Sequence, residues 1–581
     1  MSKFRKSSLA LMALIAGPAA AADLPAESVY KAPSVAAAPL PSWTGFYLGL
    51  GLGTRSSVVD TALTAASDSG LAPFSDLMGA SYCNAQSPCT SGEPVDSLAF
   101  RLSPYAGYNW QMGAQWLVGL EGDFGWAKGG RTLSGMFVPG GAASNNLFSG
   151  YAWDSYAVNT TWDASLRGRL GWLPSPTLLL YATGGATWLH VEQASVCSGS
   201  PLGVGNPGLC LAGFFAPGPI VDATTRTGWT VGAGLEALVW DHWVARAEYR
   251  YADYGTWSPT DTRTFTFPGS PTTFLTTTTD VHLHTHTATF GMAYTFGDGS
   301  RLSADTPAGA PMYVKAPLAA PAPWTGPYVG LGLGTRTSVV DTTLIAATDT
   351  GAFDPNLLDP SGSCTSTALC IPGQPLDSTA LRLSPYLGFD WQSAPQWLMG
   401  LEGDWGWAKS GRSVSGMFVP GTNSLTALVN GRPENSYTVD TGWDASLRAR
   451  VGWLPSPALL LYTTGGAAWL SVEQASVCGA VPQSFFNNRD YCGPLLFGRM
   501  YGPSAISDTT VRAGWTVGGG LEAMLWDHWM ARGEYRYADF GTWSPTDVRT
   551  CSPTCAATAL TTTTDIRIRT HTATLGLAYK F

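Results

Sequence analysis

The stretch Trp243–Asp253, with the sequence WVARAEYRYAD, contains the pattern that indicates the fold class of this chain. Every second residue, from Trp243 to Tyr251, is aromatic or alanine, and arginine and glutamate alternate with them from Arg246 onward. Successive side chains point to opposite faces of a β-strand, whereas they recur every 3.6 residues in a helix. The stretch is therefore predicted to be a strand with one apolar face and one charged face.

The same alternation marks further strands before and after this stretch. The predicted strands lie near residues 46–55, 101–110, 116–126, 162–172, 178–191, 231–239 and 243–253, with a last strand that ends at Phe296. Short turns between them alternate with long loops near residues 59–97, 131–158, 192–225 and 257–280. This rhythm is typical of outer-membrane barrels, whose short turns face the periplasm and whose long loops face outward. The sequence predicts an all-β fold, a transmembrane antiparallel up-and-down β-barrel.

The whole unit then occurs a second time. Trp43-Thr44-Gly45 returns as Trp324-Thr325-Gly326, and Glu248–Asp253 returns as Glu534–Asp539. A repeat of this length is a domain rather than a solenoid unit, so the chain is a tandem duplication. The predicted organisation is a signal peptide at 1–22, a Pro/Ala-rich periplasmic leader at 23–42, barrel repeat 1 at 43–296, a Pro/Ala-rich linker at 297–323 and barrel repeat 2 at 324–581.

The N-terminus has the composition of a cleaved secretory signal. Positive residues (Lys3, Arg5 and Lys6) precede the apolar run Leu9–Ile15, and the small residues Ala20-Ala21-Ala22 follow it. A membrane anchor would need about 20 apolar residues. We therefore expect export through the inner membrane.

The overall composition agrees with a barrel in a membrane. The chain has 68 Gly, 24 Trp and 22 Tyr, while charged residues are only 13% of the total. Many aromatic residues and glycines with few charges suit strands that alternate between lipid and lumen. The formal net charge of −9 argues against nucleic acid as a partner.

All ten cysteines fall within predicted long loops, in close pairs. Local disulfides are expected, because an exported protein meets an oxidising compartment and no pair has zinc-ligand spacing with a nearby histidine. The candidate pairs are Cys83 with Cys89, Cys197 with Cys210, Cys364 with Cys370, Cys478 with Cys492, and Cys551 with Cys555. No metal or other cofactor is expected.

With these features the chain resembles the small outer-membrane β-barrel proteins of alphaproteobacteria, the opacity-type porin or surface-antigen family. The resemblance rests on Tyr30-Lys31-Ala32-Pro33, on Trp43–Gly49, on Glu248–Tyr251 and on last strands that end in aromatic residues. Tyr579 and Phe581 look like the C-terminal signal by which such barrels are recognised for insertion. The resemblance implies an OmpA-like eight-stranded barrel in the outer membrane of a Gram-negative bacterium, exposed at the cell surface. It does not decide between a porin, an antigen and a haemin binder.

Charged residues on the predicted lumen face form a nearly balanced set in each repeat. They are Arg55, Arg101, Glu121, Asp123, Asp163, Arg167, Arg169, Glu236, Arg246, Glu248 and Arg250 in the first, and Arg336, Arg382, Glu402, Asp404, Asp444, Arg448, Arg450, Glu522, Arg532, Glu534 and Arg536 in the second. An eight-stranded barrel is only wide enough to be filled by side chains. Buried charges must then pair, because an unpaired one costs several kcal/mol of desolvation. The alternative is a conducting lumen whose charges select ions.

Two closures of the strands are compatible with the sequence: two eight-stranded barrels, or one sixteen-stranded barrel of porin size. The long linker and the aromatic-ended last strand of each repeat favour two barrels. One sixteen-stranded barrel would leave an aqueous channel.

The loop end of the last strands carries cations on the lipid-facing side. These are His282, His284 and His286 in the first repeat, and Arg567, Arg569 and His571 in the second. Three histidines spaced by two suggest metal or haem, but arginine cannot replace histidine as a metal ligand. A solvated rim, or contact with lipopolysaccharide phosphates, fits both repeats.

The function expected is a structural surface barrel that stabilises the envelope or binds external ligands through its loops. The alternative is a porin for small hydrophilic solutes, and a lesser one is haem, metal or lipopolysaccharide binding at the rim. No enzyme activity is expected: His242 and His528 lie at the periplasmic end, beside Asp241 and Asp527 in tight turns, and His190 becomes Ser471 in the second repeat. The expected partners are outer-membrane lipid and the barrel-insertion machinery, and the sequence identifies no external ligand.

Overall fold

The computed structural model consists of two closed antiparallel sheets, one from each repeat. It describes residues 42–69, 93–139, 149–197, 218–240, 242–265, 272–296, 324–349, 373–420, 430–479, 504–526, 528–550 and 559–581. The predicted signal peptide, the linker and nearly all of the leader lie outside these ranges. Among the described residues, no helix is long and apolar enough to cross a membrane.

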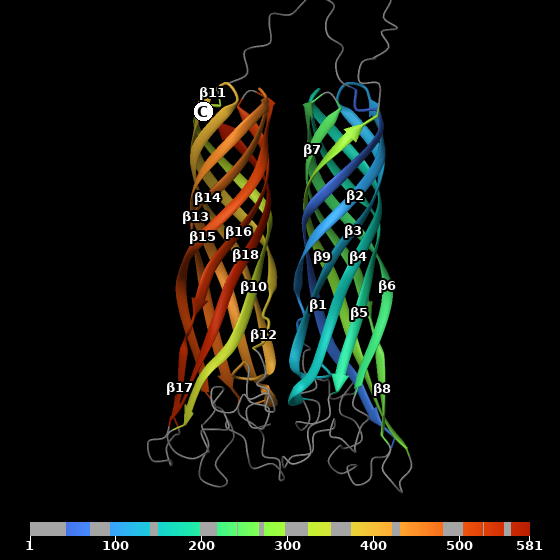
Figure 1. Ribbon diagram of the computed structural model, residues 1–581, viewed down its shortest axis with the longest axis vertical. Coiled ribbons are helices and arrows are strands. Elements are labelled where there is room, and N and C mark those ends of the chain that lie inside the picture. Colours follow the sequence, from blue (N-terminus) through green and yellow to red (C-terminus); the bar gives the residue numbers. More distant parts are fainter. Residues whose placement is uncertain are drawn as a thin grey trace, which may run out of the picture. The chain divides into compact units, whose positions relative to one another are not determined.

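The first sheet is coloured blue to green in Figure 1. Its strands are β1 (Gly45–Asp68), β2 (Ser97–Met112), β3 (Trp116–Met136), β4 (Ser149–Ser175), β5 (Leu178–Cys197), β6 (Gly218–Trp240), β7 (Trp243–Trp257), β8 (Thr260–Phe265) and β9 (Thr273–Thr295). Neighbours in sequence pair in order, and β1 closes the barrel by pairing with β9 from Tyr47 opposite Thr295 to Asp68 opposite Leu275. The short β8 pairs only with the outer part of β9.

The second sheet repeats this topology in yellow to red (Figure 1). Its strands are β10 (Gly326–Asp349), β11 (Ser378–Ala394), β12 (Trp397–Met417), β13 (Asn430–Ser456), β14 (Leu459–Cys478), β15 (Ser504–Trp526), β16 (Trp529–Trp543), β17 (Thr546–Thr550) and β18 (Ala559–Lys580). Strand β10 pairs with β18, so this sheet also closes on itself. The prediction of two eight-stranded barrels is confirmed, and the alternative of one sixteen-stranded barrel is wrong.

The strands are longer than the sequence predicted. Segments expected to be loop, such as residues 59–68 and 131–136, continue β1 and β3, and β8 was not expected at all. Their alternation is hard to read, because residues facing the lumen there are valine, leucine and threonine and no longer differ in polarity from those facing outward. The strand at 178–191, which alternates least clearly, is present as β5.

A β-bulge with a glycine bends β7 in the first barrel and β16 in the second. The register of β7 with β9 shifts between Asp253 and Thr256, and Gly255 at this bulge has a φ of +69°. A left-handed φ favours glycine, which has no Cβ to clash. The carboxylate of Asp253 accepts the Gly255 N–H at 2.8 Å and stabilises the bend. Gly541 and Asp539 repeat the arrangement in β16.

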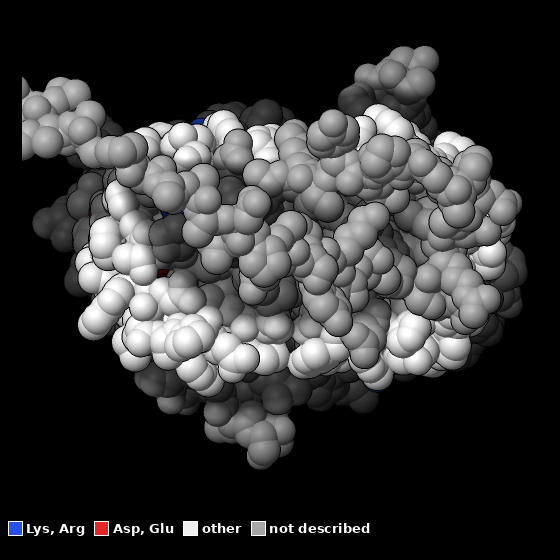
Figure 2. Space-filling view, turned by 90° about the horizontal axis from the view of Figure 1, so that it is seen from above, with Lys and Arg blue, Asp and Glu red and all other residues white. Residues whose placement is uncertain are grey.

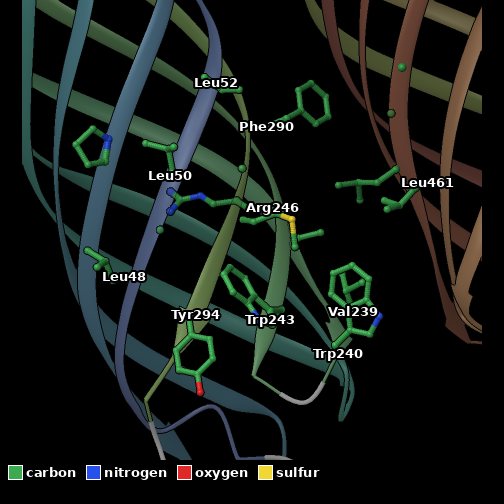
Figure 3. Close-up of a pocket in the computed structure, with 18 of the residues that line it drawn as sticks. Leu48, Leu50, Leu52, Val239, Trp240, Trp243, Arg246, Phe290, Tyr294 and Leu461 are labelled. Carbon is green, nitrogen blue, oxygen red and sulfur yellow. The ribbon is translucent and has the colours of Figure 1, made fainter.

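The outer wall of each barrel carries an apolar band between aromatic residues. In the first barrel, Leu48, Leu50 and Leu52 on β1 are each about half exposed. Figure 3 shows them along β1, with Trp240, Trp243 and Tyr294 gathered toward the short turns. An apolar band with aromatic girdles is the lipid-facing surface of an outer-membrane barrel. On the end of the molecule that Figure 2 shows, the described residues display few charged atoms.

Candidate functional site: the lumen

The centre of the first lumen is a network of buried arginines and carboxylates. Glu121 accepts two hydrogen bonds from Arg246, with Nη1–Oε2 at 2.7 Å and Nη2–Oε1 at 2.8 Å, and a further one from Arg167. Arg167 also donates to Glu248 at 2.9 Å. Because an arginine fork matches a carboxylate in shape, such pairs recover much of the desolvation cost of both ions.

A second group of charges lies nearer the loop end. Asp163 accepts from Arg55 and Arg101 at 2.5 Å each. Asp123 accepts from Arg101 at 2.5 Å and from Arg250 at 2.8 Å. Glycines make room for these side chains: a Cβ on Gly125 would lie 2.3 Å from Nη2 of Arg101. The six arginines and five carboxylates predicted for this lumen therefore lie in one continuous network, none more than 9% exposed.

The second barrel has the same network at the same positions. Glu402 accepts from Arg532 at 2.7 and 2.8 Å, and Asp444 accepts from Arg336 at 2.6 Å and Arg382 at 2.5 Å. Every predicted lumen charge of this repeat also faces inward. Pairing, which the sequence offered as one of two alternatives, is the arrangement observed among the described residues of both barrels.

Three tyrosines in each lumen belong to the network but were not named as site residues. Tyr47 donates to Glu121 at 2.8 Å and accepts from Arg169 at 2.8 Å, and Tyr181 donates to Glu248 at 3.0 Å. The guanidinium of Arg246 lies 4.3 Å from the centre of the Tyr105 ring. The sequence contained a signal for two of them: Tyr47 and Tyr105 are an even number of residues from Arg55 and Arg101, so each shares the lumen face of that arginine. This alternation does not show which aromatic side chain reaches a charge.

The second barrel adds a charge pair that the first lacks. Lys580 donates to Asp390 across 3.2 Å, and both side chains are at most 2% exposed. The first barrel has Asn109 and Thr295 at these positions. A carboxylate and an ammonium group thus appear together in the second repeat, and an alignment of the two repeats could have predicted that they pair. Since one residue of each charge is added, the lumen balance is the same in both barrels.

A tryptophan closes the short-turn end of each lumen. The Trp43 side chain is buried among Leu117, Leu179 and Val244 and donates its Nε1–H to the carbonyl of Pro176 at 2.9 Å. Gly45 makes this turn possible with a φ of +146°. The equivalent Trp324 donates to Pro457 at 2.9 Å. The repeated Trp-Thr-Gly block is thus an inward-turned closure of the barrel.

An apolar layer fills the lumen between the charges and the loop end of each barrel. Its side chains are at most 1% exposed and come partly from strand extensions that the sequence placed in loops, as at Val59 and Leu133, and partly from predicted strands, as at Leu189 and Leu283. They are Val59, Leu133, Tyr156, Val158, Leu189, Val191, Val281 and Leu283 in the first barrel, and Val340, Val414, Tyr437, Val439, Leu470, Val472, Ile566 and Ile568 in the second. A packed apolar layer excludes water, so each lumen is filled on both the loop side and the short-turn side of its charged centre.

The outer mouth of each lumen is covered by an arginine and a phenylalanine. Arg263 on β8 donates to the Ser195 carbonyl at 2.8 Å and to the Gly218 carbonyl at 2.9 Å, and its guanidinium lies 5.2 Å from the Phe137 ring centre. Arg549 and Phe418 form the same pair at 5.0 Å. Sequence reasoning missed this layer, because it depends on β8 folding back against β9.

The predicted rim cations lie on the outer wall of the last strands. The rings of His282, His284 and His286 follow one another at 5.8 and 5.4 Å, and Nδ1 of His286 lies 2.7 Å from the Tyr249 hydroxyl. The second barrel has Arg567, Arg569 and His571 there, with the same contact from Tyr535. Among the described residues, no three His, Cys, Asp or Glu side chains are arranged to hold a metal ion. Contact with lipopolysaccharide stays a prediction.

Two of the predicted disulfide cysteines are described. Cys197 ends β5 and Cys478 ends β14, both are buried, and each takes part in a disulfide bond. Cys83, Cys89, Cys210, Cys364, Cys370, Cys492, Cys551 and Cys555 lie outside the described residues. The five predicted pairings therefore stay predictions.

The predicted insertion signal closes the second barrel. The Phe581 N–H donates to the Pro327 carbonyl at 3.0 Å, and the rings of Tyr579 and Phe581 lie 5.2 Å apart on the outer wall. Phe296 makes the same closure with Phe46 in the first barrel, at 2.8 Å. Recognition of these residues by the insertion machinery stays a prediction.

Comparison with known proteins gives matches for both halves. A family model described as an outer membrane protein beta-barrel domain matches residues 7–296 and again residues 306–581. The 31 kDa outer-membrane immunogenic protein of Brucella melitensis is 27% identical over 249 residues, covering 42% of this chain and 86% of that protein. The 22 kDa outer membrane protein of Rhizobium leguminosarum is 29% identical, covering 37% of this chain and 66% of that protein.

Solved structures give weaker likenesses. A Pseudomonas aeruginosa FadL homologue covers 92% of this chain and 90% of its own, at 9% identity and a TM-score of 0.25. At this score the likeness bears neither on the fold nor on the function.

Proposed function

Because the chain belongs to the outer membrane protein β-barrel domain family, with one such domain in each half, we propose that it is a structural surface protein made of two closed, non-conducting barrels. Each barrel anchors long external loops in the outer membrane and strengthens the envelope. The names of the Brucella relatives, outer-membrane immunogenic proteins, support exposure of such loops at the cell surface.

The observation that carries this proposal is the filling of the lumen along its length. Trp43 lies at the short-turn end, the network around Glu121 lies in the centre, and Phe137 with Arg263 lies at the outer mouth. A porin of sixteen strands holds a water-filled channel, whereas eight strands leave room only for side chains. The porin alternative therefore has no support from the described part of the chain.

Conductance across a planar bilayer tests the proposal. The full chain, refolded and shown to be heat-modifiable on a gel, is expected to give no steady ohmic single-channel current. A sixteen-stranded porin inserted in the same bilayer serves as the positive control. A reproducible, stable conductance from the intact chain would overturn the proposal.

Protease treatment of intact cells tests the exposure of the loops. Cleavage is expected in the segments between β1 and β2 and between β10 and β11, because long loops face outward in this class of barrel. A short turn such as Gln111–Gln115 is expected to be protected, and cleavage there in intact cells would contradict the proposed orientation.

A further inference from the structure

The outer wall of the second barrel carries a small pocket at the loop end of its apolar band. A cavity of about 210 Å³ is lined by Trp407, Asp440, Gly442, Trp443, Ser471 and Glu473, among others. We propose that this pocket binds a planar guanidinium group, and that the first barrel fills the equivalent place with its own His190.

Two β-bulges form the pocket. The register of β12 with β13 shifts between Trp407 and Ser410, and that of β13 with β14 shifts between Thr441 and Asp444. Gly442 and Trp443 therefore lie opposite the single residue Ser471. A bulge bends its strand and redirects a side chain, and bulges are frequent at barrel rims and near functional sites.

The two barrels differ in what covers the tryptophan of this bulge. In the first barrel Trp162 is stacked on both sides, against Phe124 at 5.5 Å and 18° and against His190 at 5.7 Å and 5°. In the second barrel Trp443 is stacked against Trp405 at 4.5 Å and 14°. Ser471 occupies the position of His190, so the other face of Trp443 borders the cavity.

The glycine of the bulge enlarges the same space. Gly442 stands where the first barrel has Thr161. A Cβ added to Gly442 would lie 3.5 Å from both Cβ and Oγ of Ser471, which is an ordinary van der Waals distance. A threonine is thus tolerated at 442, and it would occupy part of the cavity.

The pocket of the second barrel is more negative than the equivalent place in the first barrel, which favours a cation. Asp440 replaces Asn159 of the first barrel and lies directly opposite Glu473 across β13 and β14. Like charges facing each other across two strands are destabilising unless a cation lies between them. Lys409 on the pocket wall supplies one positive charge against these two carboxylates. The second barrel has therefore lost an imidazole and gained a carboxylate at one place.

A guanidinium meets all of these features. It is planar, stacks on tryptophan as a cation, and binds carboxylates through a fork of N–H donors. A cavity of about 210 Å³ has room for about seven waters at about 30 Å³ each, which suits one guanidinium and part of its stem. Lysine has neither the flat face nor the fork.

The place of the pocket makes it accessible from outside the cell. Along β12, the outward residues Met399, Leu401, Trp405 and Trp407 are followed by the exposed Lys409. Tryptophans at this change from apolar to charged residues mark the membrane–water interface. A guanidinium presented from the medium therefore reaches the pocket without entering the hydrocarbon.

Saturation-transfer NMR on the full chain in detergent micelles tests the proposal, with N-acetylarginine amide as the probe. Transfer to the side-chain protons of the probe is expected, and the affinity for N-acetyllysine amide is expected to be at least about fivefold lower. Ser471→His, Gly442→Thr and Asp440→Asn are each expected to reduce the arginine signal strongly. Heat-modifiability on a gel confirms that each variant folds.

The first barrel offers a matched gain of binding. His190→Ser combined with Thr161→Gly and Asn159→Asp is expected to create a second site and to double the binding stoichiometry for the arginine probe. Equal binding of the arginine and lysine probes, or an undiminished arginine signal in Ser471→His, would overturn the proposal. These outcomes are independent of conductance, so they leave the proposed structural function unaffected.

Discussion

Glu121 and Arg246 form a two-bond ion pair in the first lumen, at 2.7 and 2.8 Å, and Glu402 and Arg532 form the same pair at the same two distances in the second. The pair is the centre of each network, because Arg167 and Tyr47 also donate to Glu121. A site with so many donors on one carboxylate depends on the charge of that carboxylate.

Glu121→Gln is expected to destabilise the first barrel by about 3–5 kcal/mol, because it leaves Arg167 and Arg246 buried with less compensating charge. The measurement is the midpoint of urea unfolding in lipid vesicles, followed by tryptophan fluorescence. Glu192→Gln on the outer wall is the control and should change stability by less than about 1 kcal/mol. Equal midpoints for both variants would show that the network adds nothing to stability.

The first barrel serves as a reference for a prediction about Asp390 and Lys580, because it has uncharged residues at both positions. Asp390→Asn alone is expected to cost about 3–5 kcal/mol, because it leaves Lys580 buried without an opposite charge. Lys580→Thr alone is expected to cost less, because Asp390 keeps Arg450 Nε at 3.6 Å. The double variant has the residues of the first barrel, Asn109 and Thr295, and is expected to recover most of the loss. A double-mutant cycle in urea measures the coupling. Additive losses would mean that the two residues do not act as a pair.

Arg263→Ala is expected to loosen β8 without unfolding the barrel. The side chain supplies three hydrogen bonds, to the carbonyls of Ser195 and Gly218 and to the Ser195 hydroxyl. Hydrogen exchange of the Thr260–Phe265 amides should become faster, because local opening costs less once these bonds are absent. Thr264→Ala on the same strand, whose side chain is exposed, is the control. Unchanged exchange in Arg263→Ala would exclude its role as a fastening of β8.

Each half of the chain is expected to fold without the other. Residues 1–296, and residues 324–581 placed behind residues 1–42, should each give a heat-modifiable band in the outer membrane. The reason is that β1 pairs with β9 and β10 with β18, so each ring of strands closes within its own half. Failure of both halves, with normal folding of the full chain, is the contrary result.

Much of the lumen was predictable from the sequence. Residues such as Arg101, Asp163 and Glu248 were placed on the inner face because a strand alternates with a period of two, and polarity then tells one face from the other. The comparison of the two repeats strengthened this, since both keep the whole set. The apolar layer around Val59 and Leu133 was missed for the converse reason. Where both faces have similar polarity, period-two alternation contains no signal.

Local periodicity was enough to predict the strand class, the eight strands of each repeat and the inward charges, and the repeated sequence blocks revealed the duplication. The closure of each sheet on itself became known from the three-dimensional structure, since it depends on pairing between residues as distant as Tyr47 and Thr295. That structure also showed which arginine meets which carboxylate, and that Ser471 leaves open the tryptophan face that His190 covers. These outcomes rest on contacts across the barrel, which no local pattern in the chain specifies.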